Sequence, residues 1–134
     1  MSRFLVDTSV SVPLIMSSHP SHASVTRKLG RRPLLLAGHA AVETYSVLTR
    51  LPGDARLSAS DALRLIVDRF VGAADLPDPI EAIRHLSEVG VEGGATYDGL
   101  VALCVGPGDI LFSRDLRASA TYARVGVAVE LIAS

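Results

Sequence analysis

Short apolar segments that alternate with helix-like segments are the feature that most limits how this chain can fold. The apolar segments are residues 3–7, 34–36, 110–112 and 127–131, each too short to be a helix. Apolar strands separated by helices pair in parallel and are covered by helices on their faces. The pattern therefore predicts an α/β fold with a central parallel β-sheet flanked by helices, arranged as α/β/α layers.

Helices are predicted between the strands from apolar spacing and from glycine and proline stop signals. Their expected ranges are residues 19–30, 39–51, 58–71, 80–89, 96–105 and 116–124, with a further helix directly after the first strand. The range 58–71 has an apolar face at helical spacing. We expect the residues of that face to point to the core: Leu63, Ile66, Val67, Phe70 and Val71.

The composition is that of one globular domain spanning residues 1–134. With 13 basic and 14 acidic side chains the net charge is −1, which argues against a strongly basic DNA-binding or membrane-surface protein. Cys104 is the only cysteine, so the chain forms no internal disulfide, and we expect it in a reducing compartment, the cytoplasm. Its apolar stretches fall short of the roughly 20 residues that a membrane span needs, and we identify no signal peptide.

Four acidic residues stand near the predicted carboxyl edge of the sheet, where ligand sites of open α/β folds form. Asp7 directly follows the first strand, and Glu43 lies in the first turns of the helix after the second. Asp115 comes three residues after Phe112, in the third predicted strand. Asp98 opens the helix before that strand, so local chain order places it at the opposite edge unless the long preceding segment brings it round.

Carboxylates gathered in one pocket repel one another, by about 4 kcal/mol for two unit charges some 4 Å apart at an effective dielectric of roughly 20. A divalent cation removes that cost, and Mg²⁺ and Mn²⁺ favour oxygen ligands. The four acids are therefore candidate ligands for a metal that activates water for phosphoryl chemistry. Stabilisation of helix N-termini is the alternative explanation for Glu43, Asp98 and Asp115, but it explains Asp7 less well.

Four motifs in order resemble the acidic set of PIN-domain proteins. They are Asp7-Thr8-Ser9, the stretch 39–52 around Glu43, Tyr97-Asp98 with the apolar residues that follow, and residues 112–115 ending in Asp115. The resemblance extends over residues 3–131 and is strongest toward the VapC toxins, the ribonucleases of bacterial toxin–antitoxin pairs. Two departures are Ser113, where many relatives have threonine, and the short Gly/Pro-rich segment 104–109.

The resemblance implies a PIN-like domain with an endoribonuclease activity that depends on Mg²⁺, or alternatively on Mn²⁺. It implies that the catalytic and metal-binding residues are Asp7, Glu43, Asp98 and Asp115. It also implies a small antitoxin protein as partner, and the high mean hydropathy of +0.37 adds the expectation of a homodimer. The expected reaction is hydrolysis of phosphodiester bonds in a transfer RNA or another structured RNA by metal-activated water.

Several neighbours of the acids are candidates for supporting roles. Thr8 and Ser9 are expected to cap the following helix, which is the commoner role, to bind the carboxylates, or to do both, and Ser113 offers a further hydroxyl. Contact with the RNA backbone is expected from three arginines, of which Arg114 is also placed to pair with an acid. They are Arg50, Arg114 and Arg117.

Other functions stay open at this point. A phosphoacceptor signalling domain also has an Asp after its first parallel strand, but it needs a lysine near a late strand, and Lys28 is the only lysine. A catalytically silent binding module of PIN shape would not need the complete acid set. The histidines show no metal-ligand spacing and are expected at surface or capping positions. The basic cluster Arg27, Lys28, Arg31 and Arg32 is either a solvated helix face or a phosphate or partner contact.

Overall fold

Five parallel strands form the centre of the protein in the computed structural model, which describes residues 2–133. The strands are β1 (Phe4–Val6), β2 (Leu35–Ala37), β3 (Gly72–Ala74), β4 (Ile110–Ser113) and β5 (Val129–Leu131). Their order across the sheet is β3-β2-β1-β4-β5, and every neighbouring pair is parallel. The prediction of an α/β fold with a central parallel sheet is confirmed.

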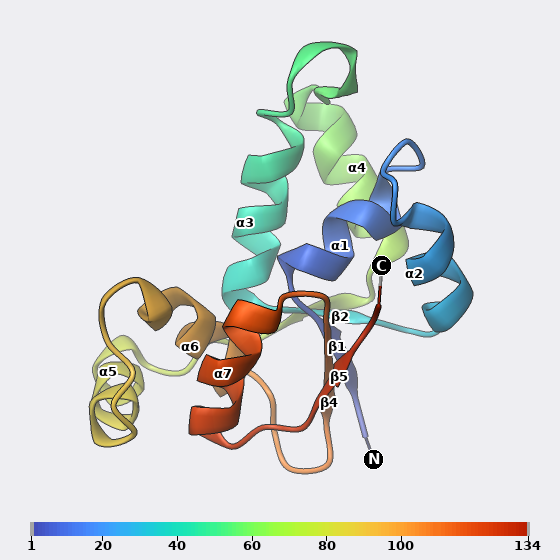
Figure 1. Ribbon diagram of the computed structural model, residues 1–134. Helices are drawn as coiled ribbons and strands as arrows, with labels where there is room; N and C mark the ends of the chain where they lie inside the picture. The colour runs from blue at the N-terminus through green and yellow to red at the C-terminus, as the bar shows by residue number, and fades with distance from the viewer. Residues whose placement is uncertain (1, 134) are drawn as a thin grey trace.

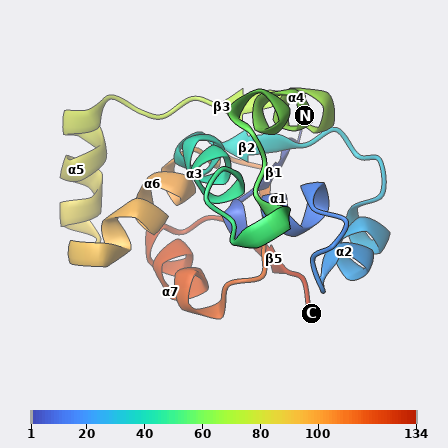
Figure 2. The same ribbon diagram turned by 90° about the horizontal axis from the view of Figure 1, so that it is seen from above.

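Helices connect the strands and cover both faces of the sheet (Figures 1 and 2). They are α1 (Thr8–Ile15), α2 (His22–Leu29), α3 (Gly38–Leu48), α4 (Ala59–Arg69), α5 (Pro79–Glu88), α6 (Thr96–Leu103) and α7 (Leu116–Val125). Two short 3₁₀ turns, η1 (Gly53–Ala55) and η2 (Gly93–Ala95), lead into α4 and α6. Every helix expected from the sequence is present, although α2 begins later than expected, at His22.

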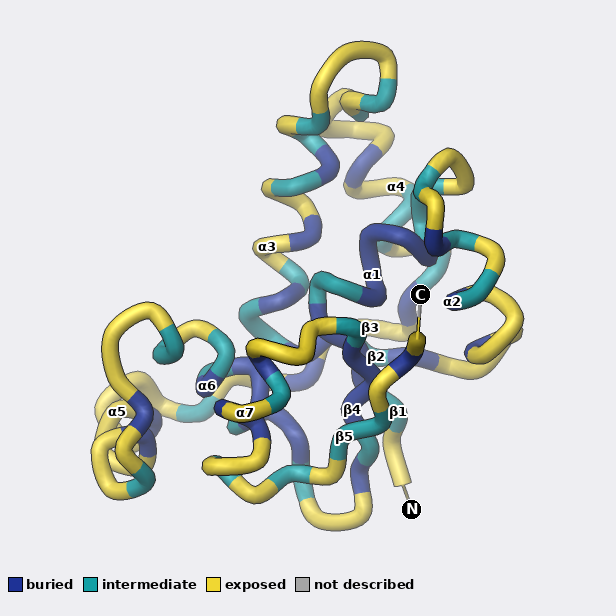
Figure 3. Tube along the Cα trace, in the orientation of Figure 1, coloured by how far each residue is buried: buried dark blue, intermediate teal, exposed yellow. Residues whose placement is uncertain are grey.

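The two faces of the sheet have separate cores because successive residues of a strand point to opposite sides. Leu5 and Leu111 pack with residues of α3, α6 and α7, whereas Val6 and Phe112 pack with residues of α1 and α2. Figure 3 shows the buried residues concentrated along the sheet and on the helix faces turned toward it. This two-sided core fixes the strands, and therefore their carboxyl ends, in one rigid layer.

The apolar face predicted for residues 58–71 is only partly buried. Leu63, Val67 and Val71 are 58%, 64% and 69% exposed, so their assignment to the core is wrong. Ile66 and Phe70 do pack into the core. The reason is that α3 and α4 project together beyond the sheet (Figure 1), so that α4 meets its neighbours along a narrow stripe and leaves the rest of its apolar face in water.

Strand β3 was not predicted because its Gly-Ala-Ala sequence has none of the branched or aromatic residues that favour strands. Pairing with β2 forms it, with Ala73 opposite Leu36. Gly38 permits this close approach, because a Cβ atom at that position would lie 2.9 Å from the carbonyl oxygen of Ala74. The helix that carries Glu43 can therefore begin directly at the end of β2.

Two members of the basic cluster have structural contacts. Lys28 Nζ lies 2.7 Å from Glu130 Oε2, and the guanidinium of Arg32 lies 5.2 Å from the ring centroid of Phe4. These contacts favour a structural role for both residues. In the part of the chain that the structure describes, no helix is long and apolar enough to cross a membrane.

Candidate active site

A small pocket lies at the carboxyl edge of the sheet, where the chain leaves β1 and β4 and enters the helices that follow them. All four predicted acids line it: Asp7, Glu43, Asp98 and Asp115. Its volume is about 40 Å³, enough for a few water-sized species because one water needs about 10–15 Å³. Residues far apart in the sequence are thus brought together by the fold.

Asp98 reaches this pocket because of the direction of α6. The segment that contains α5 and η2 returns the chain to the carboxyl edge, and α6 then runs back across the sheet to the turn before β4. The first turn of α6 therefore faces the pocket. The expectation from local chain order, which placed Asp98 at the opposite edge, is wrong, and the alternative in which the preceding segment brings it round describes the structure.

Asp7 is the most enclosed of the four acids, with 4% of its surface exposed. Its Oδ1 accepts hydrogen bonds from the backbone N–H of Ser9 at 3.1 Å and from Ser9 Oγ at 2.5 Å. Its Oδ2 accepts from Ser113 Oγ at 2.6 Å and from the Tyr122 hydroxyl at 2.7 Å. Donors from α1, β4 and α7 therefore hold the carboxylate in one orientation.

Burial and like charges disfavour ionisation in this pocket. Burial raises the pKa of Asp7 above its ordinary value of 3.8, and the hydrogen bonds from Ser113, Ser9 and Tyr122 only partly oppose that shift. The pKa of Asp98 is also raised, first by burial and then by the charges of Asp115, Asp7 and Glu43. The acids repel one another in the absence of a cation.

Two of the acids also cap helices. Asp7 is the N-cap of α1, and Asp115 is the N-cap of α7, with its Oδ1 accepting from the N–H groups of Arg117 at 2.9 Å and Ala118 at 3.1 Å. Glu43 lies further along α3, is 46% exposed, and has its Oε2 4.0 Å from His39 Nε2. Helix capping therefore accounts for the local position of two acids but not for the convergence of four.

The hydroxyl residues beside Asp7 have distinct positions. Since Asp7 itself is the N-cap of α1, the expectation that Thr8 or Ser9 caps this helix is wrong. Ser9 binds the carboxylate instead, as does Ser113. Thr8 lines the pocket, and its buried Oγ1 atom has no hydrogen-bond partner among residues 2–133. The Thr8 hydroxyl oxygen is therefore available to bind a species in the pocket.

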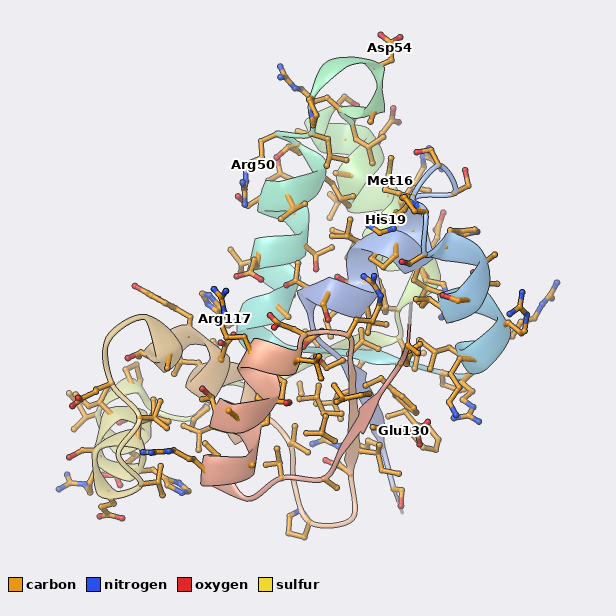
Figure 4. The ribbon with its side chains drawn as sticks, viewed as in Figure 1. Met16, His19, Arg50, Asp54, Arg117 and Glu130 are labelled. Carbon is orange, nitrogen blue, oxygen red and sulfur yellow. The ribbon has the colours of Figure 1, made fainter. Side chains whose placement is uncertain are left out.

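The three arginines differ in their relation to the pocket. Arg114 donates from Nη1 to the carbonyl oxygen of Ser9 at 3.0 Å and from Nη2 to Ser21 Oγ at 2.7 Å, which holds its guanidinium on the α1–α2 side. Arg117 lines an open groove that adjoins the pocket. Arg50 lies beyond the far end of α3, well away from Arg117 (Figure 4). The structure therefore leaves Arg117 as the arginine best placed beside the acids.

Three aromatic residues at the site were missed from the sequence. Tyr122 is fully buried on α7 and donates to Asp7, and His39 and Tyr97 line the pocket with their rings stacked. A signal for Tyr122 exists, because it follows the buried Ala118 at helical spacing and a buried tyrosine hydroxyl normally needs a partner. Its partner could not be read from the sequence.

Several side chains of the pocket could hold a divalent metal ion. Its candidate ligands are mainly oxygen atoms, from the four carboxylates and the unpartnered Thr8 hydroxyl, with the imidazole of His39 beside them. Within residues 2–133, however, no three His, Cys, Asp or Glu side chains are grouped closely enough to form a preassembled metal site. Binding of a cation would therefore require acidic side chains of the pocket to move closer together.

A larger open groove of about 830 Å³ lies apart from the acids, between α5, the turn at residues 104–109 and residues 125–128. It contains His85 and Glu88 but none of the four acids. The small acidic pocket is the better candidate active site because chemistry depends on the convergence of reactive groups rather than on volume.

Comparisons with known proteins agree with the fold and the site. The chain is 46% identical over 133 residues to ribonuclease VapC27 of Mycobacterium tuberculosis, with 96% of each chain covered. It is 42% identical over 139 residues to ribonuclease VapC40 of the same species, covering 94% of this chain and 96% of VapC40. A DNA-bound VapBC structure from Salmonella typhimurium matches with a TM-score of 0.66 and 17% identity over 98% of both chains. No family model matches the chain.

A parallel five-stranded sheet covered by helices, with acids at its carboxyl edge, defines a PIN-type protein. The identity to VapC27 and VapC40 over nearly the full length is more specific than the shared fold. The chain belongs to the VapC ribonuclease family, as the sequence motifs indicated.

The raised pKa of Asp98 predicts a pH-dependent effect of replacing it. A carboxyl group with a raised pKa stabilises the fold while protonated, below its ordinary value of 3.8, and that contribution is lost as pH rises through the raised value. In the presence of a chelator, the Asp98→Asn variant is therefore expected to have the same free energy of unfolding as the parent at the acidic end of the pH range. At neutral pH it should be more stable by about 0.5 kcal/mol, a small gain because water screens a partly exposed charge.

Urea unfolding at a series of pH values measures this difference. Asp54→Asn is the matched control, because Asp54 is exposed and lies at the far tip beyond α3 (Figure 4). An Asp98→Asn chain that is less stable than the parent at neutral pH, or that behaves like the Asp54→Asn chain at every pH, would contradict the repulsion described above.

Proposed function

We propose that this protein, an endoribonuclease of the VapC family, cleaves RNA with a divalent cation held by Asp7, Glu43, Asp98 and Asp115. The observation that carries the proposal is the gathering of these four carboxylates in one pocket against their mutual repulsion. Mg²⁺ and Mn²⁺ favour the carboxylate oxygens that these four residues supply. The proposed substrate is a transfer RNA or another structured RNA.

The chain's own residues have separate tasks in this proposal. Ser9, Ser113 and Tyr122 fix the orientation of Asp7, so that one acid stays in place while the others adjust. When bound, a divalent cation offsets the charge of the phosphate and lowers the pKa of a bound water. Because the net charge is only −1, attraction of RNA has to come from local groups.

The groove beside the pocket supplies such groups. It has a volume of about 580 Å³ and is lined by Ser9, Arg114, Asp115, Leu116 and Arg117. It shares Ser9 and Asp115 with the acidic pocket, so an RNA backbone lying in it would continue directly over the acids. The positive charge of Arg117 attracts the phosphates of the RNA in this groove. Arg114 adds a second positive charge, which its hydrogen bond to Ser21 holds on the α1–α2 side.

Water rather than the ribose is the expected nucleophile. Activation of a 2′-hydroxyl usually requires a general base and a general acid near the phosphate, and within residues 2–133 His39 is the only histidine that lines the pocket. Attack by water on the phosphorus expels the 3′-oxygen. The products should then carry a 3′-hydroxyl and a 5′-phosphate.

An antitoxin partner and a homodimer complete the proposal. The solved VapBC structure from Salmonella typhimurium is similar in fold, which supports a small protein partner for this chain. More than half of the surface of several large apolar side chains is exposed, and such surfaces mark contacts with other proteins. They are Val42, Leu63, Val67, Val71, Ile80, Ile83 and Leu116.

The cation-dependent nuclease activity is tested with the purified chain and an RNA pool. Asp7→Asn keeps the size of the side chain but removes its charge, so activity should fall about 100-fold or more. Excess EDTA should abolish cleavage by the parent, and Mg²⁺ should restore it. Asp54→Asn is expected to cleave like the parent. Undiminished cleavage by Asp7→Asn, or in EDTA, would refute the proposed site.

Analysis of the product ends separates the two nucleophiles. Ligation and phosphatase treatment of the fragments should reveal 5′-phosphate and 3′-hydroxyl ends. A 2′,3′-cyclic phosphate on the upstream fragment would show that the ribose attacked, and the water mechanism would then be wrong.

Expression in cells tests the toxin and the assembly. The chain expressed alone should stop growth, Asp7→Asn should not, and light scattering of the purified protein should give the mass of a dimer. Normal growth with the active chain would contradict the toxin role, and a monomer at micromolar concentration would contradict the homodimer.

A further inference from the structure

Tyr97 and His39 form an aromatic pair at the mouth of the acidic pocket. Their ring centroids are 5.3 Å apart and their planes are inclined by 25°, which is a stacked arrangement. Both residues line the pocket, yet Tyr97 remains 57% exposed. An aromatic ring that served only to pack α6 against α3 would be buried, because burial is what makes such packing favourable.

The position of this ring relative to the acids is fixed by the fold. Tyr97 directly precedes Asp98 in the first turn of α6, and His39 lies one helical turn before Glu43 in α3. The stacked pair therefore joins the same two helices that carry two of the acids. Both rings and both of these acids are thus carried by helical residues.

Two chemically different features adjoin the acidic pocket. The groove with Arg114 and Arg117 shares Ser9 and Asp115 with the pocket but contains neither Tyr97 nor His39. The arginine-lined groove and the exposed aromatic pair thus border the same acids. Arginine side chains suit phosphates, whereas an aromatic face suits a nucleobase.

We propose that the Tyr97–His39 pair is a stacking site for one unpaired nucleobase of the RNA that lies across the acidic pocket. The proposal rests on the ribonuclease function proposed above and adds a binding residue and its ligand class. Stacking needs only the flat face of a base, so the site accepts all four bases and favours the larger purines. A base in a duplex has both faces covered by its neighbours, so the site selects unpaired positions.

Binding measurements on an uncleavable complex test the stacking site. Asp7→Asn serves as the background, and the probes are a fluorescent single-stranded oligoadenylate and an abasic ribose-phosphate chain of the same length. Adding Tyr97→Ala should weaken oligoadenylate binding by about 5- to 150-fold, the range that loss of one base–aromatic stack produces. It should leave binding of the abasic chain unchanged, because that probe has no base to stack.

Three further variants make the test specific. Tyr97→Phe keeps the ring and should bind oligoadenylate like the background chain, and Tyr97→Trp should bind at least as well. Tyr45→Ala is the matched control, since Tyr45 is an exposed tyrosine of α3 that does not line the pocket, and it should have no effect. Circular dichroism of each variant verifies the fold.

Specific outcomes would overturn the stacking site without touching the ribonuclease proposal. They are unchanged oligoadenylate binding by Tyr97→Ala, equal losses for Tyr97→Phe and Tyr97→Ala, or an equal loss with the abasic probe. Unchanged RNA binding together with lost affinity for the antitoxin would assign the ring to a protein contact instead. Failure of the parent chain to cleave RNA with Mg²⁺ would refute the proposed function itself, which makes the two failures distinguishable.

Discussion

Burial of the Asp7 carboxylate is the interaction on which the rest of the site depends. A carboxylate at the end of a core strand loses its water, which disfavours the charged form. Hydroxyl groups of Ser9, Ser113 and Tyr122 replace that water. Because they come from α1, β4 and α7, the carboxylate joins the sheet to two helices, and the geometry of the active site is part of the geometry of the core.

The other acids add a second constraint. Asp115 shares with Asp7 the stabilising position at a helix N-terminus, where the helix dipole favours negative charge. Asp98 also lies in the first turn of a helix, α6, yet its pKa is raised by its burial and by the charges around it. The carboxylates at the carboxyl edge of the sheet therefore repel one another in the folded protein. Such repulsion is commonly retained where function requires it, at some expense of stability.

The sequence indicated the parts of the fold and site that depend on local chain order. Asp7 and Asp115 follow strands directly, and Glu43 follows a strand by a short helical segment, so the topology alone placed these acids at one edge. To predict the position of Asp98, one would have had to know the path of the long segment before α6. Its placement from local order failed because a crossover helix runs opposite to the strand it precedes.

Other features depend on contacts that spacing does not encode. Strand β3 exists because β2 offers it a hydrogen-bonding edge, not because Gly-Ala-Ala favours strands. Leu63 is exposed because α4 extends beyond the sheet. The contact from Tyr122 to Asp7 spans 115 positions of the chain, so only the folded arrangement reveals it.

The most direct test of the account is thermal unfolding of the protein in chelator and with rising concentrations of Mn²⁺. If the four acids form a cation site, the ion binds the folded chain and relieves their repulsion, so Tm should rise in a saturable way, with a gain of about 2.7 kcal/mol at roughly a hundred times Kd. The rise should be lost in Asp7→Asn and kept in Asp54→Asn. A Tm that does not change with Mn²⁺ at concentrations that support RNA cleavage would contradict the central claim.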